Sequence, residues 1–312
     1  MDKNLKKIST VNMSHEEWLE HRNKTIGGSD ASAILGMNSY SSPYTVWAEK
    51  LGKLPPKEDN EAMRIGRDLE AYVAQRFTEK TGKKVRKENN ILLNPKYPFA
   101  HANVDRMVVG EDAGLECKTT SSLNLSKFKN GEFPDNYYVQ CIHYLMVTGC
   151  KRWYLGVLVL GRGFFDFVIE RDEEEIAALA KSEEDFWKYV ESKTPPEVDG
   201  SNSTSETITT IFPNSNTETV NLFAYEDSLK QYIAIGKQIK ELKTLQDEMA
   251  NKVKSFMSEA GKGESENFKV SWPTTERATF DHKRFAEENP TIDLTDYYKH
   301  SSYRTFKVSE IK

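Results

Sequence analysis

Residues 103–121, NVDRMVVGEDAGLECKTTS, have the pattern of two short strands joined by a turn, with apolar residues where a core would need them. Because successive side chains of a strand point to opposite faces, Leu115 lies on one face while Glu116 and Lys118 share the other. The second strand therefore combines an apolar face with a carboxylate and an amine, one hairpin away from Asp105. This combination indicates that a sheet and a chemical site are built from the same strands.

These charged groups are of the kind that hydrolysis of a phosphodiester requires, namely ligands for one or two divalent cations and a cation near the attacked phosphorus. Mg²⁺ prefers oxygen ligands and is usually held by one or two carboxylates together with water and phosphate. Asp105 and Glu116 supply two carboxylates, and Lys118 can orient the water or stabilise developing charge. The same string also occurs by chance as a solvated strand face with a weak ion pair, so the interpretation depends on the rest of the chain.

The composition bounds the class of protein. The 312 residues are 38% hydrophobic and 11% aromatic, which is ordinary for a soluble globular protein and allows one large domain with an appendage, or two domains. No segment approaches the roughly 18 consecutive apolar residues of a membrane helix, and the N-terminus lacks the apolar centre of a signal peptide. We therefore expect a cytoplasmic protein with no membrane partner.

The formal net charge of −5 is unevenly distributed. Residues 170–185 hold eight acidic and two basic residues, so the remainder of the chain is close to neutral and the overall charge decides little about nucleic-acid binding. The three cysteines, Cys117, Cys141 and Cys150, form no CxxC pair and have no neighbouring histidine cluster. We expect them to be reduced, and we predict neither a zinc site nor an iron–sulfur cluster.

The spacing of apolar residues predicts helices, then a mixed β-sheet, then a helix that crosses the sheet, and then more sheet. Such an order is typical of an α/β or α+β core in which helices flank a central mixed sheet. A capping box at Ser14 and Glu17 begins the first helix, and Ser29 or Asp30 can cap the helix after the Gly27–Gly28 turn. The expected helices lie at about 14–23, within 25–36, and at 42–52, 61–82, 134–149, 172–192 and 226–259, with strands within 83–121, 152–171 and the C-terminal tail.

Composition also divides the chain into three parts. Residues 1–198 are expected to form the core that carries the charged site, and 199–225 a linker or long loop, because Ser, Thr and Asn dominate there. Residues 226–312 are expected to form an accessory region with a long amphipathic helix and a small β-rich extension. The apolar stripe of that helix suits packing on the core, on a sister subunit or on a partner protein, and the sequence does not choose among these.

Further polar residues accompany the hairpin. Glu70 lies beside the apolar stripe of the predicted 61–82 helix, where a carboxylate either approaches the metal ligands or is simply solvated. Gln140 and Tyr144 are i, i+4 neighbours on the predicted crossing helix, and a buried glutamine either bonds water or phosphate or is a satisfied core amide. Backbone N–H groups of a glycine turn, such as that at Gly28, can hold an anion.

Several blocks of the chain stand out, namely RNKTIGGSDASAILG, SPYTVWAEKLGK, GRDLEAYVAQRF, AHANVDRMV, GLECKTTS, YYVQCIHYLMVTG, VIERDEE and, near the C-terminus, SSYRTFKV. Taken together, they resemble the YqaJ-type viral recombinases, which belong with the phage lambda exonuclease in the PD-(D/E)XK nuclease superfamily. The likeness covers roughly residues 15–195. Val104 stands where the name of the superfamily has proline, a position at which proline is often absent.

The resemblance implies a metal site. Asp105, Glu116 and the backbone carbonyl of Cys117 are implied as ligands of Mg²⁺, for which Mn²⁺ would substitute. Lys118 is implied at the attacking water, and Glu70 as a support of the metal site.

The resemblance also implies residues that hold the DNA. Gln140 and Tyr144 match the QxxxY helix of the family, with Gln140 counted among the catalytic residues and Tyr144 among those that bind DNA. Arg22 and Ser29, seven residues apart, match the pair that holds the 5′ phosphate in lambda-type exonucleases. The glycine turn at Gly28 fits such an anion site independently.

For the whole protein, the resemblance implies a fold of the PD-(D/E)XK restriction-endonuclease type and a Mg²⁺-dependent 5′→3′ exonuclease. One strand of linear double-stranded DNA would be digested, which leaves 3′ single-stranded tails for recombination with a phage single-strand annealing protein. A homo-oligomeric ring, such as a trimer, and a location in the host cytoplasm follow from the same likeness. Two alternatives remain open: a RecB-like nuclease of the CRISPR-associated type, which commonly carries a cysteine cluster, and a catalytically silent DNA-binding or assembly module.

Overall fold

The charged hairpin lies at the centre of a five-stranded sheet. A computed structural model describes residues 1–56, 58–299 and 301–311, and the chain divides into two compact units, Met1–Phe212 and Pro213–Lys312. The strands of the sheet, all in the first unit, are β2 (Val85–Lys87), β5 (Arg106–Val108), β6 (Ala113–Thr120), β7 (Arg152–Val159) and β8 (Gly163–Glu170). Their order is β2-β5-β6-β7-β8, and all neighbours are antiparallel except the parallel pair β6–β7. The predicted mixed sheet is confirmed.

A smaller antiparallel sheet precedes the hairpin in the chain. Its strands are β1 (Lys6–Ser9), β3 (Asn90–Leu93) and β4 (His101–Asn103), in the order β1-β3-β4. Because β4 ends two residues before Asp105, the chain passes directly from this sheet into the charged hairpin.

Helix α4 (Glu61–Thr81) covers the apolar face of β6. Its buried Phe77 belongs to one cluster with Leu115 and Tyr154, and the ring centroids of Phe77 and Tyr154 are 5.2 Å apart. Cys117 packs at the edge of the same cluster, so the predicted apolar face is confirmed. Complete burial of an apolar side chain of this size contributes about 1.5–3 kcal/mol, which anchors the charged strand from its apolar side.

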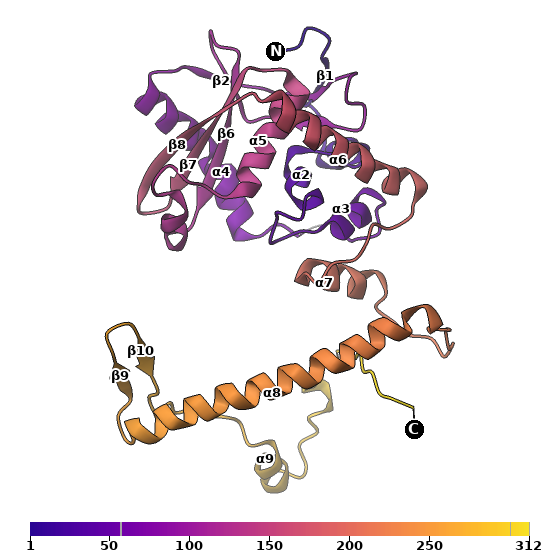
Figure 1. Cartoon of the computed structure of the whole chain (residues 1–312), viewed down its shortest axis with the longest axis vertical. Helices are drawn as coiled ribbons and strands as arrows, with labels where there is room; N and C mark the ends of the chain where they lie inside the picture. The colour runs from indigo at the N-terminus through magenta and orange to yellow at the C-terminus, as the bar shows by residue number, and fades with distance from the viewer. Residues whose placement is uncertain (57, 300, 312) are drawn as a thin grey trace. The chain divides into compact units, whose positions relative to one another are not determined.

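The opposite face of the sheet is covered by helix α5 (Asp135–Thr148). Helices α2 (Gly28–Ile34) and α6 (Glu173–Ser192) pack against α5, as Figure 1 shows. α5 is buried along most of its length and lies in the connection between the parallel strands β6 and β7, as the helical spacing of its sequence predicts. The sheet is thus enclosed between two helical layers, and side chains on both faces of β6 meet a helix.

Local signals explain where several helices begin and end. α1 (His15–Asn23) starts with the predicted capping box, in which the side chains of Ser14 and Glu17 each accept a hydrogen bond from the backbone of the other. α3 (Pro43–Lys50) has proline at its first position, where no backbone donor is lost. α4 ends at Gly82, whose φ of +72° suits the left-handed conformation of a helix terminus.

The start of α2 differs from the prediction. Gly27 is the N-cap residue, and Ser29 and Asp30 lie inside the first turn rather than at the cap. Asp30 still serves the helix start, because its Oδ2 accepts a hydrogen bond from Gly27 N at 2.9 Å. Glycine is itself an acceptable N-cap residue, so a double glycine leaves the first helical residue undetermined by sequence.

The prediction of a linker or long loop at 199–225 is wrong for part of that segment. Residues Asn202–Ile211 form helix α7, which packs on α3, and the first compact unit extends to Phe212. Thr204 is buried, and its Oγ1 donates a hydrogen bond to Ser42 Oγ at 2.8 Å. Ser and Thr usually indicate a loop, but here their hydroxyl groups supply an N-cap and buried hydrogen bonds.

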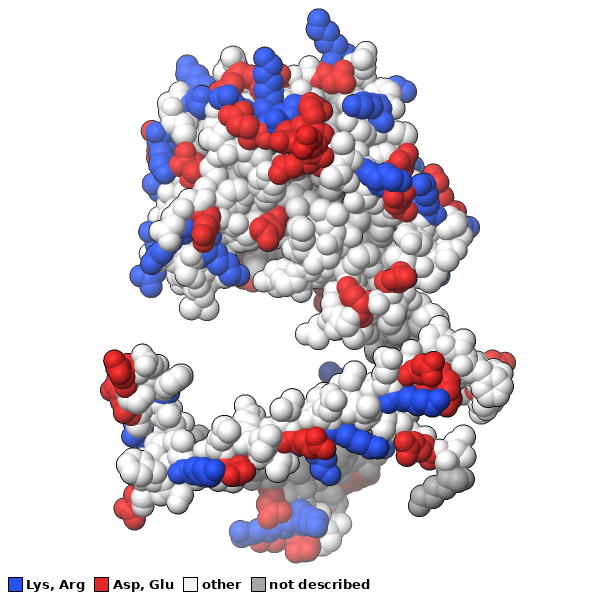
Figure 2. Space-filling model, in the orientation of Figure 1, with Lys and Arg blue, Asp and Glu red and all other residues white. Residues whose placement is uncertain are grey.

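Helix α6 combines an acidic surface with an apolar side. Its first turn contains Glu173, Glu174 and Glu175, and Figure 2 shows acidic side chains gathered over the start of the helix. Ile176 and Phe186 are buried on its other side. The prediction of an acidic surface helix is therefore confirmed.

The second unit contains the predicted long helix, α8 (Glu226–Met257), whose apolar side chains are mostly exposed. A hairpin of β9 (Lys262–Glu264) and β10 (Lys269–Ser271) and the helix α9 (His282–Glu288) follow it. This unit also contains the short 3-10 helices η2 (Phe223–Tyr225) and η3 (Thr295–Tyr297), whereas η1 (Ser122–Phe128) follows β6 in the first unit. Within the described residues, no helix is both long and apolar enough to cross a bilayer.

Candidate active site

The charged face of β6 presents Glu116 to α5. Glu116 is only 3% exposed, and its Oε1 lies 2.6 Å from Lys118 Nζ and accepts a hydrogen bond from Gln140 Nε2 at 2.9 Å. Gln140 Nε2 also donates to Tyr144 Oη at 2.7 Å. The i, i+4 pair of α5 therefore holds the Glu116 carboxylate in place.

The pattern of residues 103–121 predicts that Asp105 lies within the first strand of the hairpin. In the structure it lies in the bend immediately before β5. Its Oδ2 accepts a hydrogen bond from Cys117 N at 2.8 Å, and this bond ties it to β6 next to Glu116. Burial, together with the carboxylates of Glu116 and Glu70, raises the pKa of Asp105 well above its ordinary value. The carboxylates of Asp105, Glu116 and Glu70 therefore lie close together, and their mutual repulsion favours the protonated form of Asp105.

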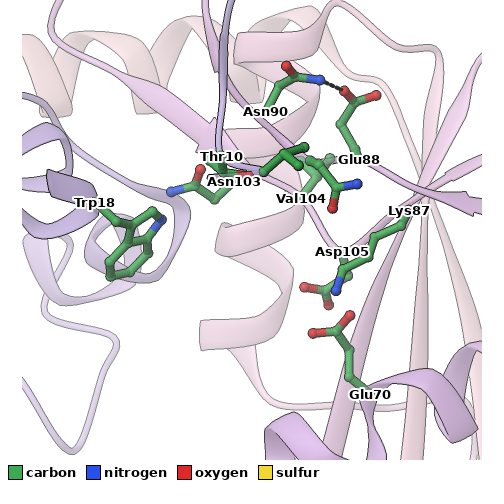
Figure 3. A pocket seen from close by; sticks show the side chains of 11 residues that line it. Thr10, Trp18, Glu70, Lys87, Glu88, Asn90, Asn103, Val104 and Asp105 are labelled. Atoms are coloured by element: carbon green, nitrogen blue, oxygen red, sulfur yellow. Dashed lines mark hydrogen bonds between the residues drawn. The ribbon is translucent and has the colours of Figure 1, made fainter. Parts of the chain in front are cut away.

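Glu70 and Asp105 point toward one another at one end of a cavity of about 510 Å³, and Trp18 lies at the other end (Figure 3). The Glu70 carboxylate is bonded to Arg106, which also donates a hydrogen bond to the backbone carbonyl of Asp105 at 2.7 Å. Sequence reasoning did not identify Arg106, since a strand arginine is ordinarily exposed. Glu70 therefore approaches Asp105 as expected, but with its charge already paired.

The carboxylates fit a divalent cation that prefers oxygen ligands. In the part of the chain that the structure describes, no three carboxylate, thiol or imidazole groups already meet at metal-binding spacing. Mg²⁺ needs only one or two carboxylates, because water and phosphate complete its shell. Among the described residues Glu116 Oε2 is buried without a hydrogen-bond partner, and burial and the neighbouring carboxylates raise the pKa of Asp105 despite the positive charge of Lys118. A divalent cation held by Asp105 and Glu116 would offset the repulsion between these carboxylates.

Lys118 carries a positive charge in this site. Burial alone would lower the pKa of its ammonium group, but the carboxylates of Glu116 and Asp105 outweigh burial and raise the pKa above its ordinary value. Lys118 Nζ also lies 5.4 Å from the centroid of the Tyr137 ring, within the range of a cation–π interaction. Lys118 is therefore suited to stabilise negative charge or to orient water, and unsuited to act as a base.

Arg22 and Ser29, which the family resemblance implies as a pair, lie within hydrogen-bond distance of each other. Arg22 Nη2 donates hydrogen bonds to Ser29 Oγ at 2.9 Å and to Asp30 Oδ1 at 2.6 Å. The guanidinium carbon lies 5.7 Å from the centroid of the Trp18 ring, so a cation–π interaction adds to these bonds. The pair can present a cation and a hydroxyl group to an anion.

Gly28 lies where this pair meets the Glu116 site. A Cβ atom on Gly28 would lie 2.6 Å from Tyr144 Cε1 and 3.2 Å from Gln140 Cγ. Only glycine therefore allows α2 to approach α5 so closely. Gly28 therefore has a role in packing. The sequence of the turn also predicts that its backbone binds an anion.

Gly28→Ala is expected to destabilise the fold by about 1–3 kcal/mol, because the added methyl group forces α2 away from the buried Tyr144 ring. Thermal or denaturant unfolding measures this loss. Gly66→Ala is the matched control, since the nearest atom, Thr119 Oγ1, would be 3.8 Å from the new Cβ in the middle of α4. Alanine at 66 should be neutral or stabilising, and equal stability of the two variants would contradict the packing role of Gly28.

Comparison with known proteins places the chain in a family. Residues 17–151 match the family model described as the YqaJ-like viral recombinase domain. The "Uncharacterized protein YqaJ" of Bacillus subtilis (strain 168) is 38% identical over 305 residues, which cover 96% of this chain and 95% of that protein. The chain belongs to the YqaJ family. The resemblance seen in the sequence blocks is thereby confirmed.

An exonuclease of known structure shares the fold of this YqaJ-family chain. The alkaline exonuclease LHK-Exo of Laribacter hongkongensis is 21% identical, and the match covers 57% of this chain and 93% of that chain. The TM-score is 0.49 for one crystal structure of LHK-Exo and 0.50 for its complex with dAMP. The likeness concerns the fold, and it agrees with the central mixed sheet and flanking helices of the YqaJ-family chain.

Proposed function

We propose that this YqaJ-family chain is a metal-dependent nuclease of the PD-(D/E)XK type. The observation that carries the proposal is the convergence of Asp105, Glu116 and Lys118 at the β5–β6 hairpin, with Gln140 bonded to Glu116. Two carboxylates on adjoining segments and an ammonium group beside them meet the needs of phosphodiester hydrolysis. The fold shared with an alkaline exonuclease supports the proposal by analogy.

Each residue of the site has its own role in this proposal. Asp105, Glu116 and the backbone carbonyl of Cys117 would hold Mg²⁺, or Mn²⁺ in its place. When bound, such a cation polarises the phosphate and lowers the pKa of a bound water. Lys118 orients the attacking water and offsets the negative charge that develops on the phosphate. Gln140 keeps the Glu116 carboxylate in its position.

Glu70 and Tyr144 act through their neighbours. The bond to Arg106 directs Glu70 toward a supporting role at the metal site, because the paired carboxylate has less charge to offer a cation. Tyr144, which the family likeness assigns to DNA binding, is buried, and its hydroxyl accepts a hydrogen bond from Gln140 Nε2 at 2.7 Å. In this proposal it fixes the Gln140 amide and so helps to hold the Glu116 carboxylate.

The Arg22–Ser29 pair gives the reaction its polarity. A guanidinium group and a hydroxyl group suit a terminal 5′ phosphate, which offers more charge and more acceptor oxygens than an internal phosphate. The close contact at Gly28 brings α2, which carries Ser29, against Gln140 and Tyr144 of α5, and Gln140 is in turn bonded to Glu116 of β6. We therefore propose that one strand of linear double-stranded DNA is digested from its 5′ end, which leaves 3′ single-stranded tails. LHK-Exo has been crystallised with dAMP, a nucleotide of the kind this reaction releases.

The 3′ tails would serve recombination by single-strand annealing. The family description, a viral recombinase domain, supports a phage single-strand annealing protein as the partner that receives the tails. A homo-oligomeric ring around the DNA, such as a trimer, is proposed on the family likeness alone.

Digestion of a linear plasmid and of its covalently closed circular form tests this proposal. With Mg²⁺, we expect the linear form to be digested from both of its 5′ ends, one on each strand, which converts the duplex to single strands. The circle should stay intact, because it has no 5′ end. EDTA should stop the reaction, and Mn²⁺ should restore it. Digestion of the circle, or digestion in EDTA, would contradict the proposed activity.

A further inference from the structure

Two buried charged residues beside Arg22 have no part in the chemistry proposed above. The side chains of Asp30 and Lys50 are only 4% and 2% exposed, and Lys50 Nζ lies 2.6 Å from Asp30 Oδ2. Asp30 belongs to α2, and Lys50 is the last residue of α3. Removal of both charges from water is costly and offsets much of their attraction. A gain in stability alone therefore does not explain this buried ion pair.

Both members of this pair bind Arg22. Asp30 Oδ1 accepts a hydrogen bond from Arg22 Nη2 at 2.6 Å, and Lys50 Nζ donates one to the backbone carbonyl of Arg22 at 2.8 Å. Asp30 Oδ2 also accepts from Gly27 N at 2.9 Å, which fixes the turn between α1 and α2. Arg22 is therefore held at its backbone and at its guanidinium group by two helices other than its own.

The second terminal nitrogen of Arg22 is left available. In the described part of the chain, the hydrogen bonds of the Arg22 guanidinium all use Nη2. Arg22 Nη1 lies 3.3 Å from the point that a Cβ atom on Gly27 would occupy, so the glycine keeps the space beside Nη1 clear. The Arg22 side chain is 24% exposed, whereas the side chains of Asp30 and Lys50 are buried.

Asp30 is ionised at neutral pH. Burial alone would raise the pKa of its carboxyl group, but the charges of Arg22 and Lys50 outweigh burial and hold the pKa below its ordinary value. The bond from Arg22 is therefore charge-assisted, and such bonds are shorter and stronger than neutral ones.

We propose that Asp30 and Lys50 are positioning residues that hold Arg22 ready for the 5′-terminal phosphate of DNA, an inference that rests on the proposed function. Their charges matter as well as their geometry. Asp30 alone would cancel the charge of Arg22, whereas the three residues together carry one net positive charge. A guanidinium group that is already oriented loses less conformational freedom on binding, and the net charge attracts the phosphate.

Lys50→Met tests the proposal, because methionine fills similar space without the charge. We would measure the binding of linear duplexes with 5′-phosphate or 5′-hydroxyl ends by fluorescence anisotropy in EDTA, which prevents turnover, and kcat and KM for both ends in Mg²⁺. The wild-type protein should prefer the phosphorylated end, and Lys50→Met should reduce this preference about tenfold, mainly through a higher KM. Lys50→Arg should retain most of the preference, because the positive charge remains.

Combination with Arg22→Ala shows whether Lys50 acts through Arg22. Arg22→Ala should remove the preference for the phosphorylated end, and Lys50→Met added to it should change nothing further. The preference is a ratio of two affinities within one preparation, so a partial loss of folded protein leaves it unaffected. Glu111→Gln is the matched control, because Glu111 is bonded to Lys83 and Tyr154 in the β5–β6 turn and should not influence the preference.

The outcomes separate this inference from the proposed function. A full wild-type preference in Lys50→Met and in Asp30→Asn would overturn the positioning role and leave the nuclease proposal standing. Equal binding of both ends by the wild-type protein would overturn the assignment of Arg22 to the 5′ phosphate, and the positioning role with it. Activity of the wild-type protein in Mg²⁺, measured on the same substrates, reports separately on the nuclease itself.

Discussion

Glu116→Gln is expected to slow DNA digestion by about 1,000-fold while the fold remains intact. The substitution removes a negative charge that the cation needs but keeps the shape of the side chain. Gln140 can still donate a hydrogen bond to the amide oxygen that replaces Glu116 Oε1. Loss of the Glu116 charge removes the partner of Lys118 Nζ but also relieves the repulsion between the Glu116 and Asp105 carboxylates, so the two effects oppose one another and the protein should stay folded. Release of nucleotides from linear duplex, with thermal unfolding of the same samples, checks both parts.

The same variant separates metal binding from folding. A cation that binds only the folded protein raises Tm, so Mg²⁺ should raise the Tm of the wild-type protein and leave that of Glu116→Gln unchanged. Glu183→Gln is the matched control: Glu183 is another buried carboxylate, paired with His143 at 2.7 Å in the α5–α6 layer, and its variant should keep the response to Mg²⁺. Digestion by Glu116→Gln at nearly the wild-type rate would refute the assignment of Glu116.

Lys118→Met is expected to lower kcat by about 100–1,000-fold with little change in KM, because Lys118 stabilises charge that appears only in the transition state. Its removal leaves Glu116 with Gln140 as its remaining partner, so folding stability should fall by about 1–3 kcal/mol. The response of Tm to Mg²⁺ should persist or increase, since the competing ammonium group is gone. Single-turnover digestion and unfolding in the presence and absence of Mg²⁺ measure these effects.

Lys80→Met provides the comparison for Lys118→Met. Lys80, near the end of α4, is paired with Asp166 of β8 at 2.5 Å, in a partly exposed ion pair outside the proposed site. Its removal should leave digestion unchanged. If Lys118→Met digested DNA as fast as Lys80→Met, the ammonium group would have no role in catalysis.

The parts of the site that depend on local periodicity are predictable from the sequence. The alternation of β6 puts Glu116 and Lys118 on one face, and the structure joins them at 2.6 Å. Helical spacing puts Gln140 beside Tyr144, and the structure joins them at 2.7 Å. These placements hold because the geometry of a strand or a helix changes little in different tertiary surroundings. Their catalytic and binding roles remain predictions.

The contacts between distant segments are not predictable in this way. Lys50 and Arg106 are charged residues of types that are mostly exposed, and only the packed fold shows that they are buried against Asp30 and Glu70. Helix α7 was not predicted for a related reason. The hydroxyl groups of Ser and Thr suit both loops and buried hydrogen bonds, so their abundance does not distinguish a loop from a packed helix. The positioning residues of Arg22 thus emerge from tertiary structure alone.

The polarity of digestion tests the central claim most directly. A linear duplex with 5′-phosphate ends would carry one label at the 5′ end of a strand and a second label at the 3′ end of the same strand. With Mg²⁺, the account predicts that the 5′ label is released first as a mononucleotide while the 3′ label stays in a long strand, and that EDTA prevents both. Release of the 3′ label first, or equal loss of both labels through internal cuts, would contradict the account.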